Sequence, residues 1–142
     1  MTVKPDLPGD SKPPAGQKAD GTKFRVLIVD DSMFIAKQLG QILQSDGFEV
    51  AGTASNGAQG VEEFKTLRPD LVTMDITMPV MDGVTALEKI LEINKDAKVI
   101  MVSALGKEDV VKKCLLMGAK SFIIKPLDRA KVLERVVTIM NR

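Results

Sequence analysis

The stretch Val-Leu-Ile-Val-Asp-Asp-Ser, residues 26–32, decides the fold, because a continuous apolar run stops there at two adjacent carboxylates. Three later apolar runs also stop at a polar residue, namely Leu71–Met74 before Asp75, Val99–Val102 before Ser103, and Phe122–Ile124 before Lys125. Short, continuous, β-rich runs are typical of parallel strands that are buried on both faces. The four runs therefore predict four strands of one parallel sheet.

Helical patterns separate these runs, and Phe48–Ala54 is predicted to form a further strand. Asn56 and Asp82 are placed to cap the starts of two helices, and Gly118 is placed to end a third. Five βα units with short connections predict an α/β fold, in which helices cover both faces of a parallel sheet.

The polar residues that follow the strands are expected to gather in one place. The carboxyl ends of parallel strands lie along one edge of the sheet, and ligands of open α/β sheets bind there. That edge would hold three carboxylates, one hydroxyl and one ammonium group, from Asp30, Asp31, Asp75, Ser103 and Lys125. Such a set suits a Mg²⁺ ion and a phosphoryl group.

Asp75 is the strongest candidate for chemistry. An aspartate after a strand often caps the next helix, but Asp82 fits that role better, since Pro79 and Gly83 indicate an intervening loop. Asp75 is then left without a structural task. A carboxylate in such a place can act as a nucleophile and form an aspartyl-phosphate.

Asp30 and Asp31 indicate a cation site. One of them could cap the first helix, although Ser32 competes for that role. Two adjacent carboxylates beside a third repel one another unless a cation is present, and Mg²⁺ binds carboxylates together with phosphate oxygens. The sequence has no histidine and one cysteine, which disfavours a zinc or haem site. Ser103 or Lys125 alone would be weak evidence for such a site. The polar residues at the ends of all four strands, namely Asp30 with Asp31, Asp75, Ser103 and Lys125, are together far more specific.

Composition bounds the domain organisation. The segment 1–23 holds four of the seven prolines and few large apolar residues, so it is predicted to be a disordered tail before a domain at 24–142. No apolar segment is long enough for a secretory signal or a membrane span. With Cys114 as the single cysteine, no internal disulfide can form, and a cytoplasmic location is expected.

Charge is divided unevenly along the chain. Residues 24–104 carry 7 Lys or Arg against 12 Asp or Glu, whereas residues 105–142 carry 9 against 4. The basic half is expected either to meet an acidic partner or to present ordinary solvated helix faces. Nucleic acid is disfavoured as a partner, since no nucleic-acid-binding motif is visible.

At these residues the chain resembles the response-regulator receiver domain family. The resemblance covers residues 24–142 and depends on four motifs in the family's order: Val-Leu-Ile-Val-Asp-Asp-Ser (26–32), Met-Asp-Ile-Thr-Met-Pro-Val-Met-Asp-Gly (74–83), Met-Val-Ser-Ala (101–104) and Ile-Lys-Pro (124–126). It implies a flavodoxin-like, doubly wound (βα)5 fold with a five-stranded parallel sheet in the order 2-1-3-4-5. Within the family, the chain is most similar to the stand-alone chemotaxis regulators.

The resemblance implies a role for each acidic residue. Asp75 would accept a phosphoryl group from a phosphohistidine on a sensor histidine kinase. Asp31, Asp75 and the backbone carbonyl of Thr77 would bind Mg²⁺, and Asp30 would hold a metal-bound water.

The resemblance also implies residues for switching and hydrolysis. Ser103 and Lys125 would bind the phosphoryl oxygens, and Ser103 with Phe122 would form the switch. Phe122 stands where close relatives often have tyrosine, so hydrogen-bonding accounts of the switch do not transfer, and plain core packing of the ring is the alternative. Thr77 and Leu105 would flank the path of the attacking water and tune dephosphorylation, unless Leu105 merely packs against the following helix.

The expected function is that of a single-domain signalling protein and not of an enzyme, with only self-catalysed phosphorylation and dephosphorylation. No output domain follows the fifth helix, so a monomer is expected to act by phosphorylation-dependent binding of the flagellar motor switch protein. A chemotaxis sensor histidine kinase would donate the phosphoryl group, and a phosphatase is a further candidate partner; no membrane or nucleic acid partner is expected. The alternative is a phosphorelay intermediate that passes phosphate to a histidine phosphotransfer protein.

Two other classes fit less well. A Mg²⁺-dependent phosphatase would need a second aspartate two residues after its nucleophile, where this chain has Thr77. A flavin-binding electron carrier shares the architecture, but the chain has no Trp or Tyr to stack on the flavin ring. Asp30 and Asp31 would also repel a flavin phosphate.

Overall fold

The computed structural model describes residues 14–141, which contain five strands and five helices in alternation. The strands are β1 (Arg25–Val29), β2 (Glu49–Ala54), β3 (Leu71–Asp75), β4 (Val99–Ser103) and β5 (Ser121–Ile124). The helices are α1 (Met33–Gln44), α2 (Gly57–Leu67), α3 (Gly83–Ile93), α4 (Glu108–Met117) and α5 (Arg129–Met140). The predicted strands are all present, with ends that differ from the prediction by at most one residue.

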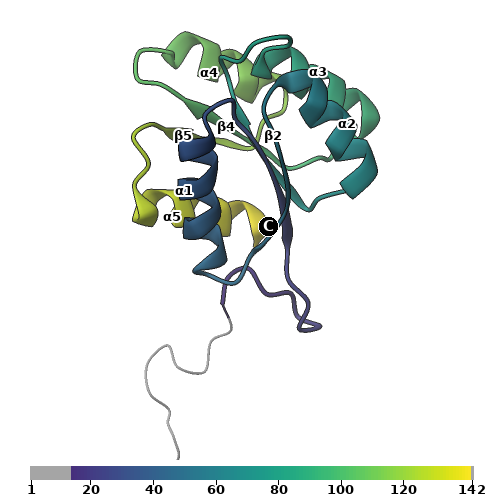
Figure 1. Cartoon of the computed structure of the whole chain (residues 1–142), viewed down its shortest axis with the longest axis vertical. Helices are drawn as coiled ribbons and strands as arrows, with labels where there is room; N and C mark the ends of the chain where they lie inside the picture. The colour runs from purple at the N-terminus through teal and green to yellow at the C-terminus, as the bar shows by residue number, and fades with distance from the viewer. Residues whose placement is uncertain (1–13, 142) are drawn as a thin grey trace, which may run out of the picture.

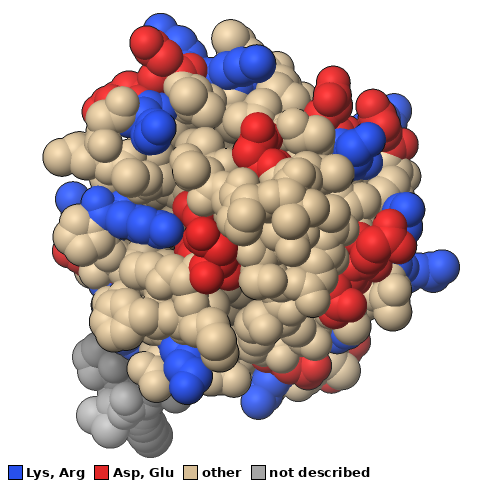
Figure 2. Space-filling view, turned by 45° about the horizontal axis from the view of Figure 1, so that its top comes forward, with Lys and Arg blue, Asp and Glu red and all other residues tan. Residues whose placement is uncertain are grey.

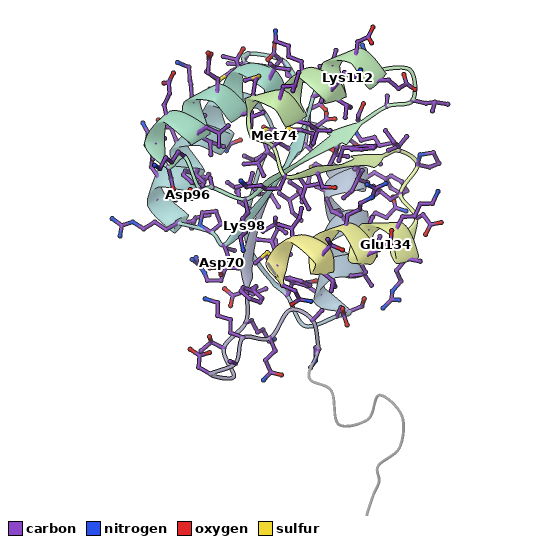
Figure 3. All side chains as sticks on the ribbon, turned by 180° about the vertical axis from the view of Figure 1, so that it is seen from behind. Asp70, Met74, Asp96, Lys98, Lys112 and Glu134 are labelled. Atoms are coloured by element: carbon purple, nitrogen blue, oxygen red, sulfur yellow. The ribbon has the colours of Figure 1, made fainter. Side chains whose placement is uncertain are left out.

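All five strands pair in parallel in the order β2-β1-β3-β4-β5, as the resemblance implied. Helices α1 and α5 lie on one face of the sheet, and α2, α3 and α4 lie on the other (Figure 1). β3 is buried along its whole length between these layers, with Met74 near the middle of the molecule (Figure 3). The α/β fold class is therefore confirmed, with one buried core on each face of the sheet.

Side-chain caps fix the starts of four helices that follow the strands. Ser32, Asn56, Asp82 and Asp128 each accept a hydrogen bond from a backbone N–H in the first turn of the following helix. Such caps satisfy backbone donors that would otherwise have no partner in the helix. Ser32 caps α1, so Asp30 and Asp31 are both free of that structural role. The caps predicted at Asn56 and Asp82 are also present.

The prediction of a disordered segment through residue 23 is wrong for residues 14–23, which we call the N-terminal strap. The Gly16 N–H donates to the Asp46 carbonyl (2.9 Å), and Gln17 pairs with Lys23 in an antiparallel bridge. A Cβ atom at Gly16 would collide with the backbone of Phe48, so the strap lies directly against the α1–β2 turn. Residues 14–23 carry few large apolar side chains, but the strap binds mainly through its backbone. Residues 1–13 lie outside the described part of the chain.

The N-terminal strap sits at the amino-terminal edge of the sheet, below the strands in Figure 1. Lys18 forms an ion pair with Asp70 (3.4 Å), whose carboxylate also accepts the backbone N–H of Arg25 (2.8 Å). The rings of Phe24 and Phe48 stack beside them. Within residues 14–141, none of the helices is long and apolar enough to cross a membrane.

Candidate functional site

Three carboxylates meet at the opposite, carboxyl-terminal edge of the sheet. Asp30 and Asp31 directly follow β1, and Asp75 is the last residue of β3, which pairs with β1. One oxygen from each of the three carboxylates lies within 4.8 Å of the other two. Asp30 and Asp75 are only 4% and 5% exposed, whereas Asp31 is exposed. Figure 2 shows acidic atoms in the middle of a largely uncharged face.

Lys125 places a positive charge between two of these carboxylates. Its Nζ lies 3.2 Å from Asp30 Oδ2 and 3.2 Å from Asp75 Oδ1. The residue immediately follows β5, and its backbone N–H donates to the Ser103 carbonyl at the end of β4 (2.8 Å). The end of β4 thus fixes the backbone from which the ammonium group reaches the acidic cluster.

The electrostatics of the site favour a proton or a cation at Asp75. Burial, and then the negative charge of Asp30, raise the pKa of Asp75 to about 6, although Lys125 acts in the opposite direction. Burial acts to lower the pKa of Lys125, but Asp75 and Asp30 outweigh it and raise that pKa. One ammonium group therefore does not neutralise the cluster fully.

The donor set fits a hard divalent cation. The three aspartates provide only carboxylate oxygens, which are the ligands that Mg²⁺ prefers. Their close spacing and the raised pKa of Asp75 show that added positive charge would relieve repulsion. Mg²⁺ commonly uses one or two carboxylates with waters and phosphate oxygens, and the exposed Asp31 leaves the site open to solvent.

Ser103 lies at the end of β4, next to β3, and is 1% exposed. Its hydroxyl donates to the carbonyl of Ala104 (2.8 Å) in this structure. The predicted hydroxyl is thus present at the carboxyl edge, but it bonds locally and not to the acidic cluster. It remains a candidate donor to an anion that arrives at Asp75.

Gly83 brings the loop backbone close to Asp75, and Gly57 brings the start of α2 against the same β3–α3 loop; neither contact was predicted from the sequence. The N–H of Gly83 donates to the Ile76 carbonyl (2.7 Å), and a Cβ at Gly83 would collide with the carbonyl of Asp75. A Cβ at Gly57 would collide with the backbone of Met81. In the sequence each glycine directly follows a predicted helix-capping residue, which could have drawn attention to it. Only the structure shows what each glycine contacts.

The residues predicted to tune hydrolysis lie on the exposed rim of the site. Thr77 is exposed, and Leu105 is 78% exposed in the β4–α4 loop. Leu105 therefore does not pack into the core beneath α4. It lines a pocket of about 490 Å³ together with Lys125 and Phe122.

Phe122 lies in β5, opposite Met101 of β4, and its ring is partly buried against the core on the α3–α4 face of the sheet. The ring does not take part in the acidic cluster. Its core contact agrees with plain packing, while its place in the pocket beside Lys125 links it to the site.

Comparisons with known proteins agree with this geometry. The family model described as "Response regulator receiver domain" matches residues 26–137. The chemotaxis protein CheY of Treponema pallidum is 62% identical, covering 99% of this chain and 100% of the relative. The CheY of Bacillus subtilis is 50% identical, covering 82% of this chain and 98% of the relative.

A solved structure gives the same result. The CheX–CheY–BeF3–Mg complex of Borrelia burgdorferi contains a chain that is 55% identical, with a TM-score of 0.87. The match covers 91% of this chain and 98% of that chain. With these sequence relatives and this fold, the chain is CheY-like and belongs to the response regulator receiver domain family.

Proposed function

We propose that this protein accepts a phosphoryl group on Asp75 from a histidine kinase and controls chemotaxis through phosphorylation-dependent protein binding. The observation that carries the proposal is the buried Asp75 carboxylate, held beside Asp30, Asp31 and Lys125 at the carboxyl edge of the sheet. The similarity to CheY proteins over almost the whole chain supports the chemotaxis role. The same relatives do not favour the phosphorelay intermediate.

The proposed transfer is a displacement at phosphorus. An oxygen of Asp75 attacks, a P–O bond forms, and the electron pair of the P–N bond leaves with the imidazole of the donor. With a pKa of about 6, Asp75 is mostly ionised at neutral pH and can act as the nucleophile. Lys125 already contacts Asp75 and would hold a phosphoryl oxygen. Rotation of the Ser103 hydroxyl away from Ala104 would provide a second donor.

Magnesium is part of the proposal. Asp31 and Asp75, with the Thr77 carbonyl, would hold the ion, and Asp30 would orient a water bound to it. When bound, Mg²⁺ supplies positive charge that offsets the carboxylates and the developing charge on the phosphoryl oxygens. In the Borrelia structure a CheY is found with BeF3 and Mg, which supports Mg²⁺ binding by this chain.

Intact-mass measurement after treatment with a small phosphodonor tests the proposed acceptor. We expect one added phosphoryl group in the presence of Mg²⁺, and none after EDTA treatment or in Asp75→Asn. Asp96→Asn is the matched control, because Asp96 lies in the loop before β4, at the other end of the sheet (Figure 3). Labelling of Asp75→Asn at the rate of the wild type would contradict the assignment.

The output part of the proposal needs its own test. The beryllofluoride-treated protein should bind a flagellar motor switch protein more tightly than the untreated protein does. A phosphatase is a further proposed partner, and the Borrelia neighbour, in which a CheY is in complex with CheX, supports binding of a partner protein. Equal binding of the motor switch protein with and without beryllofluoride would argue against this output.

A further inference from the structure

The Phe122 ring lies at an open margin of the sheet. Among residues 14–141, β5 is an edge strand that pairs with β4 alone, and the ring faces the core on the α3–α4 side. α5 packs on the other face, where Val132 and Val136 are buried in the opposite core. The labelled residues Lys112 of α4 and Glu134 of α5 mark these opposite sides in Figure 3. A contact between α5 and the ring must therefore pass around the edge of β5.

Arg135 makes that contact. Its guanidinium lies 4.7 Å from the centroid of the Phe122 ring, and the residue is partly buried. A guanidinium within about 6 Å of an aromatic centroid is attracted by the electron-rich face of the ring. The ring is thus enclosed between the core on one side and a cation from the opposite layer on the other.

The pocket beside this pair shares Lys125 with the acidic site. Its lining includes Phe122 and Arg135, and also Lys125, which contacts Asp30 and Asp75. Lys131, one helical turn before Arg135, lines the same pocket. A phosphoryl group on Asp75 would give Lys125 a new anionic partner, so its side chain would change position at the wall of this pocket.

We propose that Arg135 is a positioning residue, whose guanidinium holds the Phe122 ring in its resting orientation and loses that contact when a phosphoryl group occupies Asp75. The release step rests on the proposed phosphorylation, whereas the holding contact does not. A phenylalanine has no hydroxyl that could hold it by a hydrogen bond, so the guanidinium takes over this task. By linkage, a contact made only in the resting state weakens binding of any ligand that favours the other state.

The experiment uses the protein with 4-fluorophenylalanine at its five phenylalanine positions, observed by ¹⁹F NMR. Phe122→Leu assigns the Phe122 resonance. We expect Arg135→Met to shift this resonance toward the position seen with beryllofluoride and Mg²⁺. The same variant should bind beryllofluoride about two- to fivefold more tightly, the range expected for an exposed cation–π contact.

Two further variants separate this role from general effects. Lys131→Met removes a charge from the same pocket but leaves the cation–π contact of Arg135 in place, so its Phe122 resonance should not move. Arg135→Lys keeps a cation and should restore part of the wild-type behaviour. The other four fluorine resonances report whether each variant is folded.

The outcomes are distinguishable. An Arg135→Met protein whose Phe122 resonance and beryllofluoride affinity equal those of the wild type overturns the holding role. Equal effects of Arg135→Met and Lys131→Met would show that only charge matters, which also overturns it. A wild-type protein that does not bind beryllofluoride contradicts the proposed function and the release step, whatever the resting spectrum shows.

Discussion

The two edges of the sheet differ in how well their charges are balanced. At the amino edge Asp70 forms an ion pair with Lys18 and accepts a hydrogen bond from the backbone N–H of Arg25, and the Arg25 guanidinium donates to the Leu67 carbonyl (2.6 Å). At the carboxyl edge three carboxylates gather, and among residues 14–141 the ion pairs to them come from Lys125, which contacts Asp30 and Asp75. The amino edge is arranged for stability, and the carboxyl edge is arranged to receive a ligand.

Backbone geometry shows the same contrast. Val80, in the loop that follows Asp75, has a φ of 70° and is 84% exposed. A positive φ is unfavourable for a β-branched residue, and such strain is typical of functional loops. At the amino edge, Gly47 in the α1–β2 turn has a φ of 90° without strain, and Arg68, which ends α2 with a φ of 48°, is unbranched and therefore less strained there than a valine. The carboxyl edge therefore lowers the stability of the unliganded protein through its excess of carboxylates and, independently, through the strained backbone at Val80.

The largest expected effect comes from removing one charge at the carboxyl edge. We expect Asp75→Asn to stabilise the metal-free protein at pH 7–8 by on the order of 1–3 kcal/mol, because a buried charge beside Asp30 is removed. Thermal or urea unfolding with and without Mg²⁺ measures this. Mg²⁺ should stabilise the wild type more than the variant.

The pH dependence of this difference has a definite sign. The pKa of Asp75 is about 6 in the folded protein against 3.8 in the unfolded chain, so the folded state holds the proton more tightly between these values. The stability contributed by this proton is present below about pH 4 and is lost as pH rises through 6. The advantage of Asp75→Asn should therefore grow from pH 4 to pH 7. An advantage that is constant with pH would point to a cause other than ionisation.

The amino edge should respond in the opposite direction when the N-terminal strap is removed. Deletion of residues 1–21 should destabilise the protein by about 2 kcal/mol, since backbone hydrogen bonds are lost and Phe48 becomes exposed. Deletion of residues 1–13 is the control, because it keeps the strap. Phosphorylation should persist in both, since the strap lies at the far edge. Equal melting temperatures of the two truncations would show that the strap adds nothing.

The sequence predicted the strands and helix starts well, because these depend on residues that are close together in the chain. Apolar runs predicted the strands, and Asn56 and Asp82 predicted helix starts. The strand order came from the family resemblance, since five βα units alone permit several orders. The N-terminal strap was missed because its attachment depends on the backbone of Gly16, which composition does not reveal.

The part of the site that lies at the ends of the strands was predictable, because the carboxyl ends of parallel strands meet at one edge of the sheet. Asp30, Asp75 and Lys125 lie at the carboxyl ends of strands in one parallel sheet, and because these ends meet at one edge the three side chains come into contact. Arg135 follows no such rule, since its place on the Phe122 ring depends on how far α5 reaches around an edge strand. The close approach of Gly83 to the Asp75 carbonyl likewise requires coordinates.

The exposed rim of the carboxyl edge gives a smaller, kinetic test. Thr77→Asn with Leu105→Glu should speed dephosphorylation about tenfold, or about 1.4 kcal/mol of barrier, because an amide and a carboxylate can orient the attacking water. Both positions are exposed, so the core should not change. Phosphate release from the Mg²⁺-loaded protein measures the rate, with Leu105→Met as an apolar control. A double variant as slow as the wild type would show that neither position governs the water.

The smallest expected effect concerns the strained loop at Val80. Replacing this residue with asparagine, which tolerates a positive φ, should stabilise the protein by about 1 kcal/mol. The exposed valine side chain contributes little burial, so little packing is lost with it. Val80→Thr is the matched control, because it adds polarity but keeps the β-branch, and it should leave stability unchanged. Urea unfolding compares the three proteins. If threonine stabilises as much as asparagine does, exposure of an apolar group is the cause, and the contrast between the edges then rests on charge alone.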